Sequence, residues 1–265
     1  MKRKFFLILC LALFSAGVQA QKLENFSGEF IKEIKQIKEL PNKTTGPLFL
    51  DGNILYGGAG RYIFAADVSD PMNPKKLSEV EIYGSVRQIT VNKGYLYAAC
   101  RESGAWVVDV RNPSDIKIVT RFDTVELATG IDAAGDVLFL GTRQNGVEFV
   151  DISDPANPVH IRMEKTHESQ SVTYRDGILY SGEWGAHCVT VMDARDMSTL
   201  KTLKTVNLQG HGDGVKTWGN YLYAATGHHL SDPKLSDEEK KGNGHGLEIL
   251  DISDPVNPKP ISRVG

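Results

Sequence analysis

The sequence predicts an all-β fold built from repeated units of four short strands. A ten-residue stretch, Phe149–Pro158, recurs almost unchanged at Leu250–Pro258 and in variant form at Ala66–Pro74. The first aspartate of the stretch marks one position in each of five copies: Asp67, Asp109, Asp151, Asp193 and Asp251. The first three gaps between these aspartates are 42 residues each, and the last is 58. A fixed period of this length is typical of a repeat architecture.

Each unit carries a second landmark, a Leu-Tyr or Leu-Phe pair that follows a tight turn. The pairs are Leu55-Tyr56, Leu96-Tyr97, Leu138-Phe139, Leu179-Tyr180 and Leu222-Tyr223. The turns combine Gly with Asn or Asp, as in Asp51-Gly52-Asn53, and these residues supply the positive φ that a two-residue hairpin needs. The second repeat is predicted to form four strands, at Arg87–Val91, Tyr95–Cys100, Ala105–Val110 and Ile116–Phe122. Four strands in about 40 residues make one β-propeller blade, so we expect a β-propeller.

The repeated Asp-x-Ser-Asp-Pro-x-Asn-Pro piece is interpreted as a structural turn after the third strand of each blade. Its Asp and Ser side chains can cap backbone N–H groups, and its prolines fix φ and end strand pairing. A calcium site is the alternative, because the Asp oxygens are closely spaced, but repetition in nearly every blade favours the turn. The turn residues are Asp67, Asp70, Asp109, Asp151, Asp154, Asp251 and Asp254.

At these positions the chain resembles the LVIVD repeat family. The resemblance is carried by Val107-Val108-Asp109, Val147–Asp151 and Leu247–Asp251, each followed by the Ser-Asp-Pro turn or a variant of it. It covers roughly residues 46 to 265 and implies a secreted or cell-surface β-propeller of bacteria or archaea. Members of that family are mostly of undefined activity, so the resemblance implies no catalytic residues. The fourth repeat departs from the pattern, with Ala194-Arg195-Asp196 and no proline, but keeps the spacing.

The first 20 residues predict a cleavable secretory signal peptide. Lys2-Arg3-Lys4 precede an apolar run, Phe5–Phe14, and small residues end the segment at Val18-Gln19-Ala20. The apolar run is too short to anchor the chain across a bilayer. Cys10 lies inside this run, which argues against a lipoprotein. We therefore expect a secreted, periplasmic or cell-surface protein, without a transmembrane segment after cleavage.

Charge and cysteine content restrict the function further. Loss of the three basic leader residues leaves 27 Lys and Arg against 33 Asp and Glu, a net charge of −6. The acidic groups are scattered, which argues against nucleic acid as a partner. Cys100 and Cys188 lie two repeats apart, so they are expected to be too distant for a disulfide.

The predicted domain plan is a signal peptide at 1–20, an N-terminal segment at 21–45 and propeller repeats at 46–265. Within the N-terminal segment, Phe30–Leu40 has an apolar residue at every third position, as the outer strands do, and is predicted to be a ring-closing outer strand. The fifth repeat already has an outer strand in Pro260–Val264. We therefore expect five repeats of an incomplete, truncated ring with an exposed edge, and six or seven blades in the complete protein.

The histidines predict a ligand-binding face. In a propeller, the loops from outer strand to next inner strand and the loops between strands two and three share one face, and six of the seven histidines fall in or beside such loops. The insertion Leu230–Gly244 lengthens one of them, and long insertions often bind ligands. The expected face consists of His167, His187, His211, His228, His229, His245, Glu183, Trp184, Arg101 and Arg143.

Two functions are consistent with this face. The favoured one is a non-enzymatic secreted propeller that binds a protein, glycan or cell-wall ligand. The alternative is a metal-dependent hydrolase of lactonase type, because imidazole binds zinc, copper or nickel; a divalent metal would then be its cofactor, with His167 and His211 as candidate ligands. No compact metal-binding spacing, nucleophile elbow, phosphate loop or dinucleotide fingerprint appears. Convergence of the histidines in one pocket would favour the enzyme.

Overall fold

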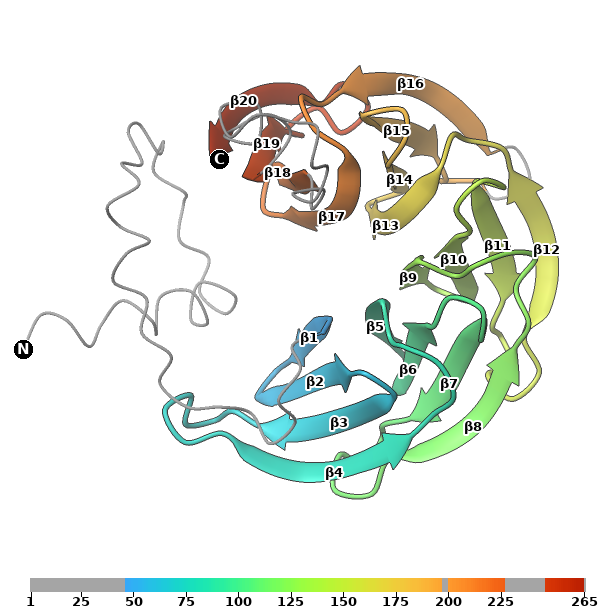
Figure 1. The fold of residues 1–265 in the computed structure, drawn as a ribbon, viewed down its shortest axis with the longest axis vertical. Coiled ribbons are helices and arrows are strands. Elements are labelled where there is room, and N and C mark those ends of the chain that lie inside the picture. The colour runs from blue at the N-terminus through green and yellow to red at the C-terminus, as the bar shows by residue number, and fades with distance from the viewer. Residues whose placement is uncertain (1–45, 197–199, 227–245, 265) are drawn as a thin grey trace, which may run out of the picture.

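The computed structural model describes residues 46–196, 200–226 and 246–264. Within these residues, twenty strands form five antiparallel sheets of four strands each, and the sheets are arranged in a ring (Figure 1). Each sheet is one blade, and in each the strands are paired in chain order. The predicted all-β propeller with four-stranded blades is therefore confirmed.

Each blade is named here by its place in the chain. Blade 1 contains β1 (Leu48–Asp51), β2 (Ile54–Ala59), β3 (Tyr62–Asp67) and β4 (Lys75–Glu81). Blade 2 contains β5 (Gln88–Asn92), β6 (Tyr95–Ala99), β7 (Ala105–Asp109) and β8 (Lys117–Phe122). Blade 3 contains β9 (Gly130–Ala134), β10 (Val137–Gly141), β11 (Val147–Asp151) and β12 (Val159–Glu164). Blade 4 contains β13 (Ser169–Arg175), β14 (Ile178–Glu183), β15 (Cys188–Asp193) and β16 (Lys201–Asn207). Blade 5 contains β17 (Gly212–Trp218), β18 (Tyr221–Thr226), β19 (Gly246–Asp251) and β20 (Lys259–Val264).

The two sequence landmarks occupy fixed places in every blade. The anchor aspartates are the last residues of the third strands, β3, β7, β11, β15 and β19. The tight turns join the first and second strands, and Lys93 and Gly94 both have positive φ, at 50° and 78°. Such a pair matches the twist of the two strands that it joins. The four strands predicted for the second repeat agree with β5–β8 to within one residue at each end.

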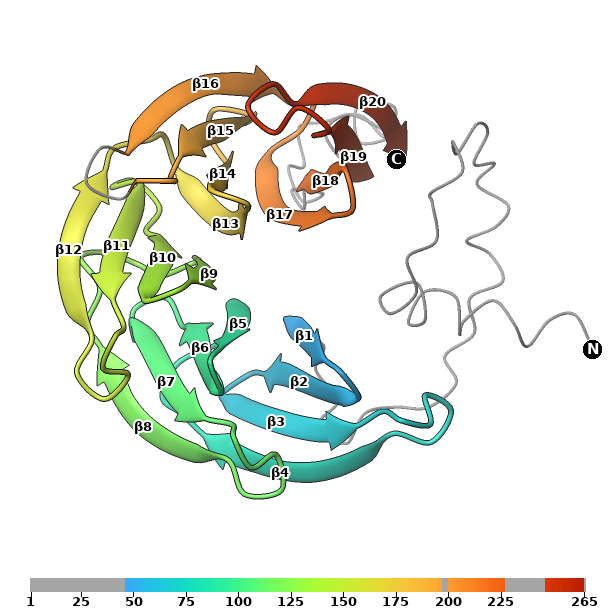
Figure 2. The ribbon, with the colours of Figure 1, turned by 180° about the vertical axis from the view of Figure 1, so that it is seen from behind.

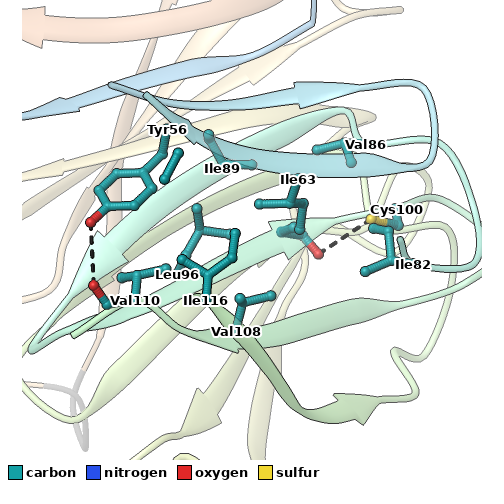
Figure 3. Close-up of a cluster of buried hydrophobic side chains, with 12 residues drawn as sticks. Tyr56, Ile63, Ile82, Val86, Ile89, Leu96, Cys100, Val108, Val110 and Ile116 are labelled. Carbon is teal, nitrogen blue, oxygen red and sulfur yellow. Dashed lines mark hydrogen bonds between the residues drawn. The ribbon is translucent and has the colours of Figure 1, made fainter. Parts of the chain in front are cut away.

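The apolar core lies between successive blades. The inner strands β1, β5, β9, β13 and β17 surround the centre of the ring, and β4, β8, β12, β16 and β20 run along its outside (Figures 1 and 2). Figure 3 shows the cluster between blades 1 and 2, where Tyr56 and Ile63 pack with Ile89 and Leu96. The Tyr56 hydroxyl donates a hydrogen bond to the Val110 carbonyl at 3.3 Å, so even this polar group is satisfied across the boundary.

Two buried glutamates tie a blade to the connection that precedes it. Glu148 on β11 accepts a hydrogen bond from the Val125 amide at 3.0 Å. Glu248, at the same repeat position on β19, accepts from the Gln209 and Gly210 amides at 2.8 and 3.1 Å. Carboxylates are strong acceptors for backbone N–H groups, so these residues hold the loops in place.

The expectation of an incomplete ring gains no support from the described residues and stays a prediction. The segment Phe30–Leu40 and the insertion Leu230–Gly244 lie outside those residues. The outer position of blade 5 is occupied by β20. In the part of the chain that the structure describes, no helix has the length and apolar character to cross a membrane.

Candidate functional site

On one face of the ring, the carboxylates of the Ser-Asp-Pro turns accept hydrogen bonds from N–H groups of the same turn. Asp151 accepts a hydrogen bond from the Ser153 amide at 2.8 Å. Asp154 accepts from the Ala156 amide at 3.0 Å and from Asn157 Nδ2 at 2.7 Å. The backbone bond from Ser153 lowers the pKa of Asp151, and the bonds from Asn157 and Ala156 lower that of Asp154. The same arrangement holds the corresponding aspartates of blades 1 and 5, namely Asp67, Asp70, Asp251 and Asp254.

The opposite face is called the loop face below. Two arginines on it occupy the same position in successive blades. Arg101 follows β6 and Arg143 follows β10, and both have positive φ, at 50° and 41°. The backbone of Arg101 exchanges two hydrogen bonds with Ala128, and that of Arg143 exchanges two with Ser169. Each arginine therefore joins its blade to the start of the next one. The Arg143 guanidinium also pairs with Glu168 at 2.8 Å.

Three aromatic side chains meet on the loop face between blades 4 and 5. Trp184 and His187 lie in the β14–β15 loop, and His211 lies just before β17. The rings of Trp184 and His211 are stacked, with centroids 4.5 Å apart and planes 14° apart. The rings of His187 and His211 lie 4.1 Å apart at 57°. We call Trp184, His187 and His211 the aromatic cluster.

Backbone contacts hold the aromatic cluster in place. His211 Nδ1 lies 2.8 Å from the Trp184 carbonyl oxygen. The Trp184 amide donates to the Glu168 carbonyl at 2.8 Å, and the Leu208 amide donates to the His187 carbonyl at 2.8 Å. Burial and the neighbouring His211 lower the pKa of His187, which favours a neutral imidazole at neutral pH.

Glu183 lies next to the aromatic cluster in the chain but does not reach the surface. Its side chain is completely buried at the end of β14. Thr166 Oγ1 donates to Glu183 Oε2 at 3.2 Å, while Oε1 has no hydrogen-bond partner among the described residues. Burial raises the pKa of Glu183, and the hydrogen bond from Thr166 opposes the rise. Glu183 therefore cannot contact a ligand on the loop face without rearrangement.

A cavity of about 380 Å³ lies between the inner strands, and residues from all five blades line it. At its loop-face end it is lined by Arg87, Gln170 and Asp213, which lie at or before the starts of β5, β13 and β17. Asp213 follows His211 by two residues, so the chain runs directly from the aromatic cluster to the loop-face end of the cavity, although the cluster itself does not line the cavity. Burial and the nearby Arg101 lower the pKa of Arg87, and Asp213 opposes this effect.

The strand register places one residue of each inner strand at the same level of the ring, and two of these five residues, Phe49 and Lys216, line the cavity. Phe49, Thr90, Asp132, Thr173 and Lys216 all pair with the Tyr or Phe of the second landmark. Thr90 donates to Asp132 at 2.9 Å. Lys216 Nζ lies 3.9 Å from Asp132 Oδ2 and 5.8 Å from the centroid of the Phe49 ring. None of these residues was predicted from the sequence, although their offset from the Leu-Tyr landmark is a signal that could have located them.

The remaining predicted site residues are not gathered into one site. His167 is exposed in the β12–β13 connection, beside Glu168, and His228, His229 and His245 lie outside the described residues. Among the residues that the structure does describe, no group of three or more His, Cys, Asp or Glu side chains is placed to hold a metal ion. Cys100 and Cys188 are buried free thiols.

Comparison with known proteins identifies the repeat. The LVIVD repeat model matches residues 83–124, 127–163 and 242–264, which confirms the resemblance: the chain carries LVIVD repeats. No curated protein matches the chain.

Solved structures support the fold alone. A functionally unknown protein from Desulfotomaculum acetoxidans aligns with a TM-score of 0.66 and 8% identity, over 85% of this chain and 71% of that one. The computationally designed protein Ika8 aligns with a TM-score of 0.54 and 14% identity, over 84% of this chain and 63% of that one.

Proposed function

We propose that this β-propeller, which carries LVIVD repeats, is a binding protein whose ligand is a carbohydrate held at the mouth of the central cavity. The observation that carries the proposal is the stacked aromatic cluster of Trp184, His187 and His211, whose His211 precedes the cavity-lining Asp213 by two residues. Aromatic faces pack well against the C–H faces of sugar rings, and polar side chains beside them can bond to sugar hydroxyls. Arg87, Gln170 and Asp213 are the polar groups of this kind.

The fixed geometry of the aromatic cluster supports binding. Trp184 and His211 stack on each other, and the backbone on both sides of Trp184 is hydrogen-bonded. A side chain that is ordered before the ligand arrives loses little conformational entropy on binding. The lowered pKa of His187 favours an uncharged ring beside His211, which suits stacking against a neutral sugar.

A glycan array that includes cell-wall oligosaccharides tests the proposal, followed by titration of the strongest glycan. Trp184→Ala should weaken binding by about 2- to 10-fold, because an aromatic contact contributes about 0.5–1.5 kcal/mol beyond its buried area. Trp218→Ala is the matched control, since Trp218 is the last residue of β17, at the opposite end of that strand from the aromatic cluster. Absence of glycan binding, or equal losses in the two variants, would refute the proposal.

We also propose that the protein is exported. The basic start, short apolar run and small residues before position 21 support removal of residues 1–20 during export. The mass of the N-terminal peptide of protein recovered outside the cytoplasm tests this. A mature N-terminus at Gln21 is expected, and retention of Met1 on exported protein would contradict it.

The alternative function, a metal-dependent hydrolase, is supported by the close approach of the His187 and His211 rings, 4.1 Å between centroids. Neutral imidazoles are common zinc ligands. Metal analysis of protein purified without an affinity tag separates the two functions. One equivalent of metal that is lost in His211→Ala would favour the hydrolase over the binding protein.

A further inference from the structure

Blade 5 exposes apolar side chains at positions that the other four blades bury. Tyr223, Leu247 and Ile249 are only partly buried. The strand register gives each of them one counterpart in every other blade, and none of these counterparts is more than 2% exposed. The counterparts are Tyr56, Tyr97, Phe139 and Tyr180 for Tyr223; Ile63, Ala105, Val147 and Val189 for Leu247; and Ala65, Val107, Phe149 and Val191 for Ile249.

Blade 1 exposes an apolar side chain on the facing side. Leu48 on β1 is 57% exposed, whereas its counterparts in the other four blades are at most 4% exposed. Leu48 pairs with the residue after the Leu-Tyr landmark, and the register gives the same place to Ile89, Ile131, Val172 and Val215. We call Leu48, Tyr223, Leu247 and Ile249 the open seam.

The open seam begins at the central cavity, where side chains of blades 5 and 1 lie close together. Lys216 Nζ lies 5.8 Å from the Phe49 ring centroid, so side chains of β17 and β1 approach each other at the cavity. Leu48, Tyr223 and Leu247 line that same cavity. Figures 1 and 2 both show β17–β20 close to β13–β16 and farther from β1–β4. Blade 5 therefore lies farther from blade 1 than from blade 4, and the apolar side chains that face this gap stay partly exposed.

We propose that residues 30–40 of this chain dock in the open seam and join blade 5 to blade 1. The chain enters β1 beside the seam, because Pro47 lines the cavity and its carbonyl accepts a hydrogen bond from the Gly58 amide at 3.0 Å. Residues 41–45 separate the proposed segment from Gly46, and that connection spans at most about 20 Å when extended. The segment is therefore tethered within reach of the seam.

The aliphatic side chains of residues 30–40 are suited to cover the apolar side chains of the open seam. Ile31, Ile34, Ile37 and Leu40 recur at every third position, with lysines, glutamates and one glutamine between them. The aliphatic side chains can cover the exposed apolar side chains of blades 1 and 5, while the charged ones stay in water. Burial of apolar surface on both sides drives such docking. This inference does not rest on the proposed carbohydrate site.

Amide hydrogen exchange on the full chain tests the docking. Ile34→Ser with Ile37→Ser removes two apolar contacts, and Lys35→Ser with Lys38→Ser is the matched control. Exchange in β18, β19 and β1 should become about tenfold faster or more in the isoleucine variant alone, because local opening frees the seam. Exchange in β9–β11 should not change. Equal exchange in the two variants, or unchanged exchange in the isoleucine variant, would overturn the proposal.

A cross-link gives a second readout that does not depend on stability. Ile37→Cys combined with Leu48→Cys, in a Cys10→Ser background, should form a disulfide within one chain. The native thiols compete little, since Cys100 and Cys188 are buried. A disulfide between chains, or none, would overturn the proposal. So would a concentration-dependent dimer that dissociates in Leu247→Ser, because a second copy would then cover the seam.

Discussion

Replacement of Glu248 by Ala should destabilise the propeller far more than loss of an exposed glutamate. Glu248 is 4% exposed, and one carboxylate oxygen accepts both the Gln209 and Gly210 amides at 2.8 and 3.1 Å. A hydrogen bond to a charged group contributes about 1.5–3 kcal/mol. Removal of the acceptor from both amides should therefore lower the free energy of unfolding by about 3–5 kcal/mol. Glu248→Gln keeps a carbonyl acceptor and should lose less than Glu248→Ala.

Urea unfolding followed by tryptophan fluorescence measures these differences. The control is Glu81→Ala, because Glu81 forms an exposed ion pair with Arg61 at 2.8 Å. Exposed ion pairs contribute about 0–1 kcal/mol. If Glu248→Ala unfolds with a free energy within about 1 kcal/mol of Glu81→Ala, the view that this glutamate holds the connection between blades 4 and 5 is wrong.

Three further predictions follow from burial, charge and backbone conformation. Burial raises the pKa of Cys100 to about 12 and that of Cys188 to about 11, so a thiol reagent at pH 8 should label neither until the protein unfolds; rapid labelling of the folded protein would contradict this. Hydrogen bonding by the neighbouring arginine lowers the pKa of Asp193 from 3.8 to about 2. As the pH falls, the Asp193 carboxyl of the unfolded chain is protonated before that of the folded protein, so the stabilisation by Asp193 should be complete above about pH 5 and should be lost progressively down to about pH 2. If the difference in free energy of unfolding between the wild type and Asp193→Asn stays constant over this range, the prediction is wrong. Gly146 has a φ of 94°, and an added Cβ would lie 2.3 Å from the Glu164 carbonyl oxygen. Gly146→Ala should therefore lower the free energy of urea unfolding by at least about 2 kcal/mol, whereas Gly219→Ala, at a position with positive φ but open space, should lower it by about 1 kcal/mol. Equal losses in the two variants would show that the steric clash at Gly146 is unimportant.

The fold could be predicted because its signals are local and repeated. The anchor aspartates end the third strands, and the tight turns with Gly, Asn or Asp join the first two strands of each blade. Five copies at a nearly fixed spacing each support the same interpretation, so the prediction holds although one copy, Met192–Asp196, is degraded. Blade 4 forms four strands although its turn lacks proline.

The candidate site could be predicted only in part, because sequence spacing places a loop but not its side chains. The positions of their loops predicted that Trp184, His187 and His211 lie on one face, and in the structure their rings contact one another. Glu183 was predicted for the same face, but its side chain is completely buried. Lys216 was missed because the cavity level depends on pairing register across blades distant in sequence. Its lack of repetition also hid it, since its counterparts are Phe, Thr, Asp and Thr.

The proposed ligand site is the cavity mouth on the loop face. Amide hydrogen exchange of the protein saturated with the strongest glycan from the array, compared with the free protein, shows where the glycan binds. Exchange should become slower at 184–188 and 208–213 and should not change in the Asp67–Lys75 turn. Protection of that turn, or of neither region, would contradict the proposed site.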